Sequence, residues 1–184
     1  MSFRARDKDF KAICASKRVL IVDDFPQHLL IMGKTLRNIG FSHLEFARSC
    51  DEAAMLCGKH SFDVVFSDYN LGPGKNGAQL LKELQDDRLL RRDAICVLAT
   101  AETSREVVLG ALESEPEAYI VKPFTESALQ RKIERLLEKQ SALGQIHDAI
   151  ADGDFRQAIT LSATGASRRR SAVEALSTTC PADT

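Results

Sequence analysis

The sequence contains no long apolar run and no excess of either charge, and each absence excludes a class of protein. No stretch approaches the length that a membrane-spanning helix requires. The charged segment Met1–Lys17 lacks the apolar centre of a signal peptide. The 25 Lys and Arg nearly balance the 26 Asp and Glu, so the net charge of -1 gives no case for nucleic-acid binding. We therefore expect a cytoplasmic protein without membrane or nucleic-acid partners.

Patterned cysteines are also missing. The five cysteines form no C-x-x-C pair, and no histidine lies at metal-ligand spacing from two of them. A zinc site is therefore not expected. An odd and unpatterned set of thiols is typical of a reducing compartment.

What is present favours one globular domain with a modest extension. The 184 residues are 44% hydrophobic and 28% charged, which is enough apolar material for a core. From about Arg18 to Gln140, short apolar runs alternate with stretches of helical periodicity. Five strands that are each followed by a helix predict an α/β fold with a parallel sheet covered on both faces. Right-handed crossovers favour the flavodoxin-like strand order 2-1-3-4-5.

The segments between the predicted strands carry signals that begin and end helices. Proline suits a first helical turn, a Ser or Thr followed by Glu three residues later forms a capping box, and glycine ends a helix. These signals are Pro26, Ser49 with Glu52, Thr103 with Glu106, Thr125 and the stop residue Gly40.

Polar residues follow four of the apolar runs, at the points where strands should end. These residues are Asp23, Asp24, Asp68, Thr100 and Lys122. Ligands bind outside the carboxyl ends of the strands in an open parallel sheet, so we expect these side chains to meet in one pocket. Three carboxylates gathered there favour a divalent cation, because their charges repel one another. The lysine and the threonine add donors suited to a phosphoryl group.

Each of these residues also has an ordinary structural interpretation. Adjacent aspartates often form a solvated turn or a helix cap, and a lysine after a strand is often a surface residue. Together, however, they supply the charge neutralisation and positioning that phosphoryl transfer requires. A shared site is therefore the better interpretation of the set.

The region from Arg18 to about Gln140 resembles a response-regulator receiver domain of two-component signalling. Four motifs agree with that family in order and spacing: VLIVDD at 19–24, FSDYNLGPGKNG at 66–77, VLAT at 97–100 and YIVKPF at 119–124. One departure is the glycine-rich loop that ends at Gly77, which is about one residue longer than usual. It is either a binding surface or a flexible connection.

The resemblance implies that Asp68 is the phosphoryl acceptor, a carboxylate nucleophile that attacks a phosphohistidine or a small phosphodonor. It also implies a Mg²⁺ site. Asp24 would bind the ion directly and Asp23 largely through water. The Asp68 side chain and the backbone carbonyl of Asn70 would complete the protein ligands.

The remaining family positions imply a switch and its timing. Lys122 would pair with the acceptor and then with a phosphoryl oxygen, and Thr100 would hydrogen-bond the phosphoryl group. Tyr119 resembles the family's aromatic switch residue. Asn70 and Glu102 lie where residues flank the path of the hydrolytic water, as in chemotaxis-type receivers, so we expect a short-lived phosphoryl group.

Three function classes compete for this site. The favoured one is a phosphorylatable switch that signals by protein–protein contact and is not a turnover enzyme. The second is a hydrolytic phosphatase with an aspartyl nucleophile, but Asp68-Tyr69-Asn70 lacks the second carboxylate that would act as acid and base. The third is a phosphate-independent scaffold, which should have lost one of the five strand-end residues. The partners implied by the resemblance are a sensor histidine kinase or phosphotransfer protein and an unnamed downstream protein.

We divide the chain into an N-terminal segment at 1–17, a receiver domain at 18–140, and a helical extension with a partly disordered tail at 141–184. The extension is too short for the DNA-binding output domains common in the family, and Arg168–Arg170 is interpreted as a solvated patch. Residues 146–159 weakly resemble a single tetratricopeptide helical hairpin.

The role of the extension stays open between several alternatives. A lone hairpin cannot bury its own face, so it would pack on the receiver, pair between chains, or begin a longer repeat domain. An equally weighted alternative is that these residues form a simple helical tail that extends the last receiver helix. Within it we expect a short helix at Gln145–Ala151, a break at Gly153, and a second helix capped by Asp154. Dimerisation through the helices after the fourth and fifth strands is a further hypothesis.

Overall fold

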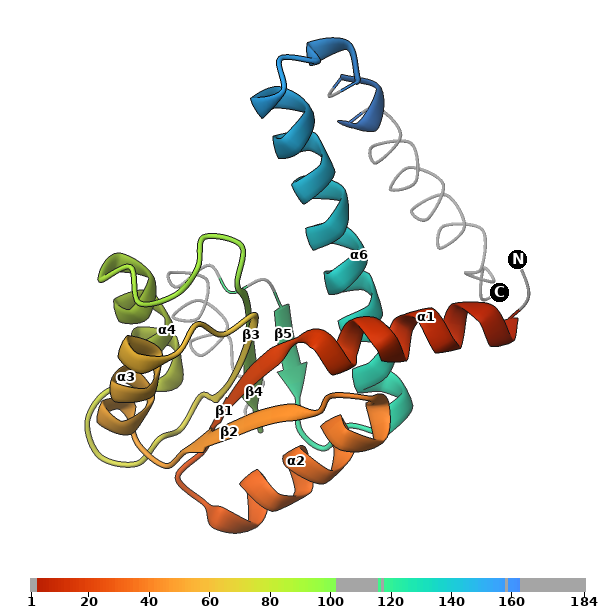
Figure 1. Cartoon of the computed structure of the whole chain (residues 1–184). Helices are drawn as coiled ribbons and strands as arrows, with labels where there is room; N and C mark the ends of the chain where they lie inside the picture. Colours follow the sequence, from red (N-terminus) through yellow and green to blue (C-terminus); the bar gives the residue numbers. More distant parts are fainter. Residues whose placement is uncertain (1–2, 102–115, 117, 158, 163–184) are drawn as a thin grey trace, which may run out of the picture. The chain divides into compact units, whose positions relative to one another are not determined.

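The computed structural model describes residues 3–101, 116, 118–157 and 159–162, and within them the chain forms a five-stranded parallel sheet (Figure 1). The strands lie in the order β2-β1-β3-β4-β5, which confirms the predicted flavodoxin-like topology. Every neighbouring pair runs parallel. Their bounds are β1 Arg18–Val22, β2 His43–Ala47, β3 Val64–Asp68, β4 Ile95–Thr100 and β5 Ala118–Val121.

Helices cover both faces of this sheet, as the sequence predicts. In Figure 1, α2 lies on one face, and α3 and α4 lie on the other. The described helices are α1 Phe3–Ser16, α2 Pro26–Ile39, α3 Cys50–Lys59, α4 Gly77–Asp86 and α6 Glu126–Ala151. The helix predicted to begin at Thr103 falls outside the described residues.

The alternation of side chains along the strands builds two cores. Leu20 and Val65 belong to a buried cluster that includes leucines of α4. Ile21 and Phe66, each one residue later, face a region shared with Met32 of α2. Because successive strand residues point to opposite faces, an apolar run with no polar alternation is what a doubly covered sheet needs.

Most of the predicted helix signals act as expected. Pro26 begins α2, and Gly40 ends it with a φ of 129°. The Thr125 hydroxyl accepts a hydrogen bond from the Ala128 amide at 3.2 Å at the start of α6. These bonds satisfy backbone groups that a helix end leaves unpaired.

The predicted capping box at Ser49 closes differently from the expectation. The Ser49 hydroxyl accepts a hydrogen bond from the Glu52 amide at 3.2 Å, as expected. The Glu52 carboxylate, however, accepts from the amide of Arg48 at 2.8 Å, one residue earlier than the box requires. The Glu52 carboxylate therefore holds the backbone just before the helix by this hydrogen bond.

The N-terminal helix α1 is not predicted by the sequence analysis. Phe10 and Cys14 are buried, and burial followed by the charge of Glu134 raises the pKa of the Cys14 thiol to about 12. The helix lies close to the end of α2, since a Cβ on Gly40 would be 3.3 Å from the Lys11 Cα. Its few apolar residues give little periodicity until a packing partner is known.

The extension differs from the prediction in one respect. Helix α6 continues unbroken to Ala151, whereas we expected a separate short helix beginning at Gln145. A single glycine such as Gly144 weakens a helix without ending it. The predicted cap at Asp154 is confirmed, because its carboxylate accepts a hydrogen bond from the Gln157 amide at 2.9 Å.

The chain divides into two compact units, residues 1–134 and 135–184. The domain boundaries drawn from the sequence and the tetratricopeptide resemblance stay predictions. The tail predicted to be partly disordered lies mostly outside the described residues. None of the described helices combines the length and the apolar character that crossing a bilayer requires.

The first prediction concerns Gly77, which begins α4. A Cβ at this position would lie 1.9 Å from the backbone oxygen of Asp68, so Gly77→Ala must displace backbone next to the site. We expect it to lower the free energy of unfolding by about 2–3 kcal/mol, measured by urea denaturation.

The matched control is Gly58→Ala in α3, where a Cβ would meet no atom within 4 Å. It should leave stability unchanged or raise it by about 0.5 kcal/mol, because alanine favours the helix. Equal stability of the two variants would contradict the proposed close approach at Gly77.

Candidate functional site

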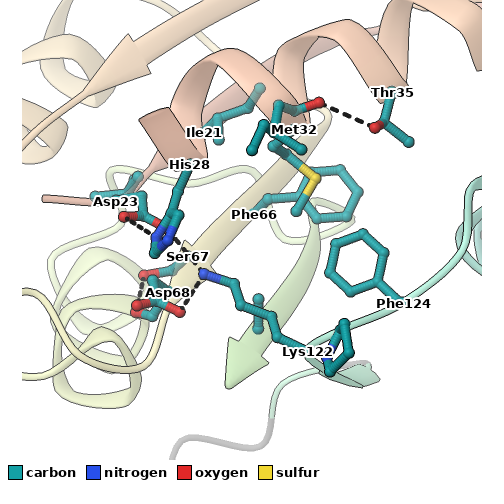
Figure 2. Close-up of a pocket in the computed structure, with 14 residues that line it drawn as sticks. Ile21, Asp23, His28, Met32, Thr35, Phe66, Ser67, Asp68, Lys122 and Phe124 are labelled. Atoms are coloured by element: carbon teal, nitrogen blue, oxygen red, sulfur yellow. Dashed lines mark hydrogen bonds and ion pairs between the residues drawn. The ribbon is translucent and has the colours of Figure 1, made fainter. Parts of the chain in front are cut away.

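The carboxyl ends of the strands bring the predicted residues together. Asp23 follows β1, Asp68 ends β3, and Lys122 follows β5. The Lys122 Nζ lies 2.8 Å from Asp68 Oδ1 and 2.9 Å from Asp23 Oδ2 (Figure 2). The side chains of Asp68 and Asp23 are only 11% and 7% exposed, so these ion pairs are largely shielded from water.

Asp23 is held by three donors. Its Oδ1 accepts a hydrogen bond from the Phe25 amide at 3.0 Å, and its Oδ2 accepts from Lys122. The His28 Nδ1 lies 3.1 Å and 3.2 Å from the two carboxylate oxygens. Figure 2 shows the His28 ring beside this carboxylate, with dashed lines that mark the two contacts. Three donors for two oxygens fix the orientation of Asp23 and leave lone pairs for a further partner.

The sequence analysis did not single out His28. The signal that could have found it is its place in the first turn of α2, five residues after Asp23. That turn lies directly beyond the end of β1, so a side chain there can reach back to the strand end. Its contact with Asp23 depends on how α2 packs, which the local sequence does not show.

The three aspartates fit a divalent cation. Asp23, Asp24 and Asp68 each offer a carboxylate oxygen, and these oxygens lie within 4.8 Å of one another. Asp24 Oδ1 is buried and has no hydrogen-bond partner among the described residues. A buried, unpaired carboxylate oxygen is costly unless a cation or a donor reaches it. An all-oxygen donor set is the kind that Mg²⁺ prefers.

The loop after β3 is tied to the site. The Gly77 amide donates to the Tyr69 carbonyl at 2.8 Å, and Asn76 forms a capping box with Gln79 at the start of α4. Gly72 has a φ of 79°, and a Cβ there would lie 3.3 Å from Asp24 Oδ2. Glycine therefore allows this long loop to pass close to the acidic cluster.

The other predicted residues are placed as follows. Thr100 is buried at the end of β4, and its carbonyl accepts the Lys122 amide at 2.7 Å. Tyr119 on β5 has a buried hydroxyl without a hydrogen-bond partner among the described residues, and burial followed by the nearby Tyr69 raises its pKa. Asn70 is exposed in the loop. Glu102 lies outside the described residues.

The electrostatics of the site are uneven. Burial raises the pKa of Asp68, the hydrogen bond and charge of Lys122 lower it, Asp23 raises it again, and the net shift is upward. Burial opposes the charge on Lys122, but hydrogen bonds and charges from Asp68 and Asp23 outweigh it and raise the pKa of the ammonium. The lysine is therefore charged, and one ammonium does not fully offset the surrounding carboxylates.

Comparison with known proteins decides the family. Residues 19–134 match the family model of the response regulator receiver domain. The chain belongs to this family. The match contains β2 to β5 in full, β1 from its second residue, and every strand-end residue of the site.

Similar proteins include two chemotaxis proteins. The receiver is 35% identical over 122 residues to chemotaxis protein CheY-3 of Vibrio cholerae, covering 66% of this chain and 92% of that protein. It is 33% identical over 122 residues to chemotaxis protein CheY of Pseudomonas aeruginosa, covering 66% and 97%.

Solved structures of receiver proteins are similar to this chain in fold. A CheY-like response regulator receiver domain protein from Methanospirillum hungatei superposes with a TM-score of 0.61 at 28% identity, covering 68% of this chain and 96% of that one. CheY4 of Vibrio cholerae superposes with a TM-score of 0.59 at 28% identity, covering 65% and 98%. These similarities therefore concern the receiver and leave about a third of this chain without a counterpart.

The second prediction follows from the raised pKa of Asp68. The folded protein holds the Asp68 proton more tightly than the unfolded chain does, so ionisation of this group costs stability at neutral pH. Asp68→Asn should therefore raise the melting temperature at pH 7 in the presence of a chelator. The gain in melting temperature should shrink as the pH falls from the pKa of Asp68 in the folded protein toward the ordinary pKa of an aspartate.

The control variant is expected to change the melting temperature in the opposite direction. A hydrogen bond from Arg91 lowers the pKa of Asp93, so Asp93→Asn should remove a small stabilisation that is present above the ordinary pKa. Differential scanning calorimetry of both variants tests the pair. A lower melting temperature for Asp68→Asn under these conditions would contradict the prediction.

Proposed function

We propose that this receiver is a phosphoacceptor response regulator of a two-component phosphorelay, with Asp68 as the acceptor. The observation that carries the proposal is the placement of Lys122 Nζ 2.8 Å from Asp68 Oδ1 beside an incompletely neutralised acidic cluster. An Asp68 oxygen forms a bond to phosphorus as the bond to the donor breaks. The leaving nitrogen or oxygen takes the bonding electron pair.

The acidic cluster is the proposed Mg²⁺ site. Asp24, Asp68 and the backbone carbonyl of Asn70 would hold the ion directly, with Asp23 acting through water. When bound, the ion supplies positive charge that offsets the charge on the phosphoryl oxygens. Asp23 is oriented for this role by His28 and the Phe25 amide.

The chain's own residues complete the reaction and the switch. Lys122 neutralises the acceptor and then pairs with a phosphoryl oxygen, while the Thr100 hydroxyl donates a hydrogen bond to the phosphoryl group. We expect Tyr119 on β5 to respond to the modification, since its buried hydroxyl has no hydrogen-bond partner among the residues that the structure describes. The added negative charge biases a two-state surface, so the protein acts as a switch and not as a turnover enzyme.

The proposed partners follow from the family. CheY-like receivers interact with histidine kinases or phosphotransfer proteins, and we propose such a protein as the phosphodonor. The output is contact with a downstream protein and not direct DNA binding. Cytoplasmic location and dimerisation stay predictions.

Two alternatives remain testable. A phosphate-independent scaffold would keep the fold without the reaction, although all five strand-end residues are present. An aspartyl phosphatase would need a second carboxylate near the nucleophile, whereas the residue two positions after Asp68 is Asn70.

The third prediction is Mg²⁺-dependent phosphorylation of Asp68. Incubation with acetyl phosphate and Mg²⁺ should add the mass of one phosphoryl group, measured by intact mass spectrometry. Asp68→Asn should abolish the adduct. The matched control Asp86→Asn removes an exposed aspartate at the end of α4 and should leave the adduct intact.

Each other result assigns a different function. Steady phosphate release without an adduct would favour the phosphatase. If neither acetyl phosphate nor phosphoramidate gave an adduct or phosphate release, the phosphoacceptor proposal would fail in favour of the scaffold. An adduct that survives Asp68→Asn would place the acceptor elsewhere.

The fourth prediction concerns the lifetime of the aspartyl phosphate. Asn70 and Glu102 are of the chemotaxis type, and the small Ala101 between Thr100 and Glu102 should leave the site open to water. After removal of the donor in Mg²⁺, we expect the adduct to disappear in far less than hours. Addition of a chelator should slow its loss, and an adduct that persists for hours in Mg²⁺ contradicts the prediction.

A further inference from the structure

A cavity of about 220 Å³ adjoins the acceptor site and has two unlike halves. Its walls come from β1, β3, β4, α2 and the segment that follows β5. Figure 2 shows Asp23, His28 and Asp68 gathered at one side of the space and Met32, Phe66 and Phe124 toward the other. The polar half contains Asp23, His28, Asp68 and Lys122, and the apolar half contains Ile21, Met32, Phe66 and Phe124. Phosphoryl transfer uses the polar half alone.

The apolar half of the cavity is suited to the uncharged part of a small ligand. Ile21 and Phe66 form a wall of this space but are only 2% and 1% exposed, so the apolar surface open to a ligand comes mainly from less buried lining residues such as Ile31, which is 65% exposed. Atoms that face a void lose dispersion contacts, and apolar cavities accept small apolar molecules. The volume lies below the roughly 300–1,000 Å³ of pockets for drug-sized ligands, so the occupant is a single ring with a short tail.

The polar half selects the charge of the occupant. Asp23 and Asp68 line the cavity and share the ammonium of Lys122, which leaves an excess of one negative charge there, and Asp24 of the same acidic cluster adds a further carboxylate outside the lining. An anion would meet this excess without compensation. A cation would relieve this excess and could donate hydrogen bonds to the free lone pairs of the carboxylates.

We propose that this cavity binds a small organic cation, a primary amine joined to one apolar ring by a short chain. The ring occupies the apolar half, and the ammonium donates hydrogen bonds to Asp23 and Asp68. Binding of the amine excludes Mg²⁺ from the same carboxylates and thereby blocks phosphorylation. The inhibitory consequence rests on the proposed phosphoacceptor function, whereas amine binding does not.

To test the proposal, 2-phenylethylamine is titrated into the ¹⁵N-labelled full chain without divalent cations. Binding is monitored by NMR spectra at each step of the titration. We expect saturable shifts with a Kd on the order of 1 mM. Three probes each remove one feature: 2-phenylethanol lacks the charge, propylamine lacks the ring, and phenylacetate reverses the charge. Each should bind at least about tenfold more weakly, because a charged hydrogen bond or the ring contact is lost.

Variants separate the cavity from the outer surface. Ala99→Val and Thr35→Leu enlarge side chains that line the cavity, and each should weaken binding at least about fivefold. Lys34→Leu is the matched control, because Lys34 is exposed on the same helix and does not line the cavity. It should leave the affinity unchanged. Two filling variants keep the test decisive if one of them does not fold.

Competition with Mg²⁺ tests the consequence. The amine should raise the Mg²⁺ concentration needed for half-maximal phosphorylation in proportion to its own concentration. Absence of saturable binding, equal binding of phenylacetate, or binding unaffected by both filling variants overturns the proposal. If the amine does not bind but Asp68 is phosphorylated, only this proposal falls. If the amine binds as expected but Asp68 is not phosphorylated, the phosphoacceptor function falls and the ligand site stands.

Discussion

The bridge that Lys122 makes between Asp23 and Asp68 is the interaction on which the site depends. Lys122 is 99 residues from Asp23 in the sequence, so the bridge forms only when the whole sheet has assembled. It ties together the ends of β1, β3 and β5, and it sets the separation of the two carboxylates. Since both carboxylates are largely buried, removal of the ammonium would leave two uncompensated charges, which is far costlier than loss of a surface pair.

The single positive charge of Lys122 does not neutralise the acidic cluster around it. One ammonium faces three carboxylates, and a buried oxygen of Asp24 has no hydrogen-bond partner in the described part of the chain. This imbalance of charge lowers the stability of the fold at this edge of the sheet, as functional sites often do. The raised pKa of Asp68 expresses the same imbalance, because burial outweighs the help that Lys122 gives.

The strand order and the strand-end residues could be predicted because both depend on local patterns. Apolar runs that end in a polar residue mark each strand of a doubly covered sheet, and their carboxyl ends must meet. His28, helix α1 and the continuity of α6 were missed for a common reason. The contact of His28 with Asp23 depends on the packing of α2, and the burial of Phe10 is a property of the folded chain. Gly144 does not by itself decide whether a helix continues.

Strand periodicity also explains why the cavity and Asp68 share a face of the sheet. Phe66 lies two residues before Asp68, and Ile21 lies two residues before Asp23, so each apolar wall residue points to the same side as the following carboxylate. Tyr119 pairs in register with Leu98 and packs with the cluster on the α3 and α4 face. A ligand in the cavity would therefore contact the face that carries Asp23 and Asp68, while Tyr119 lies on the other face.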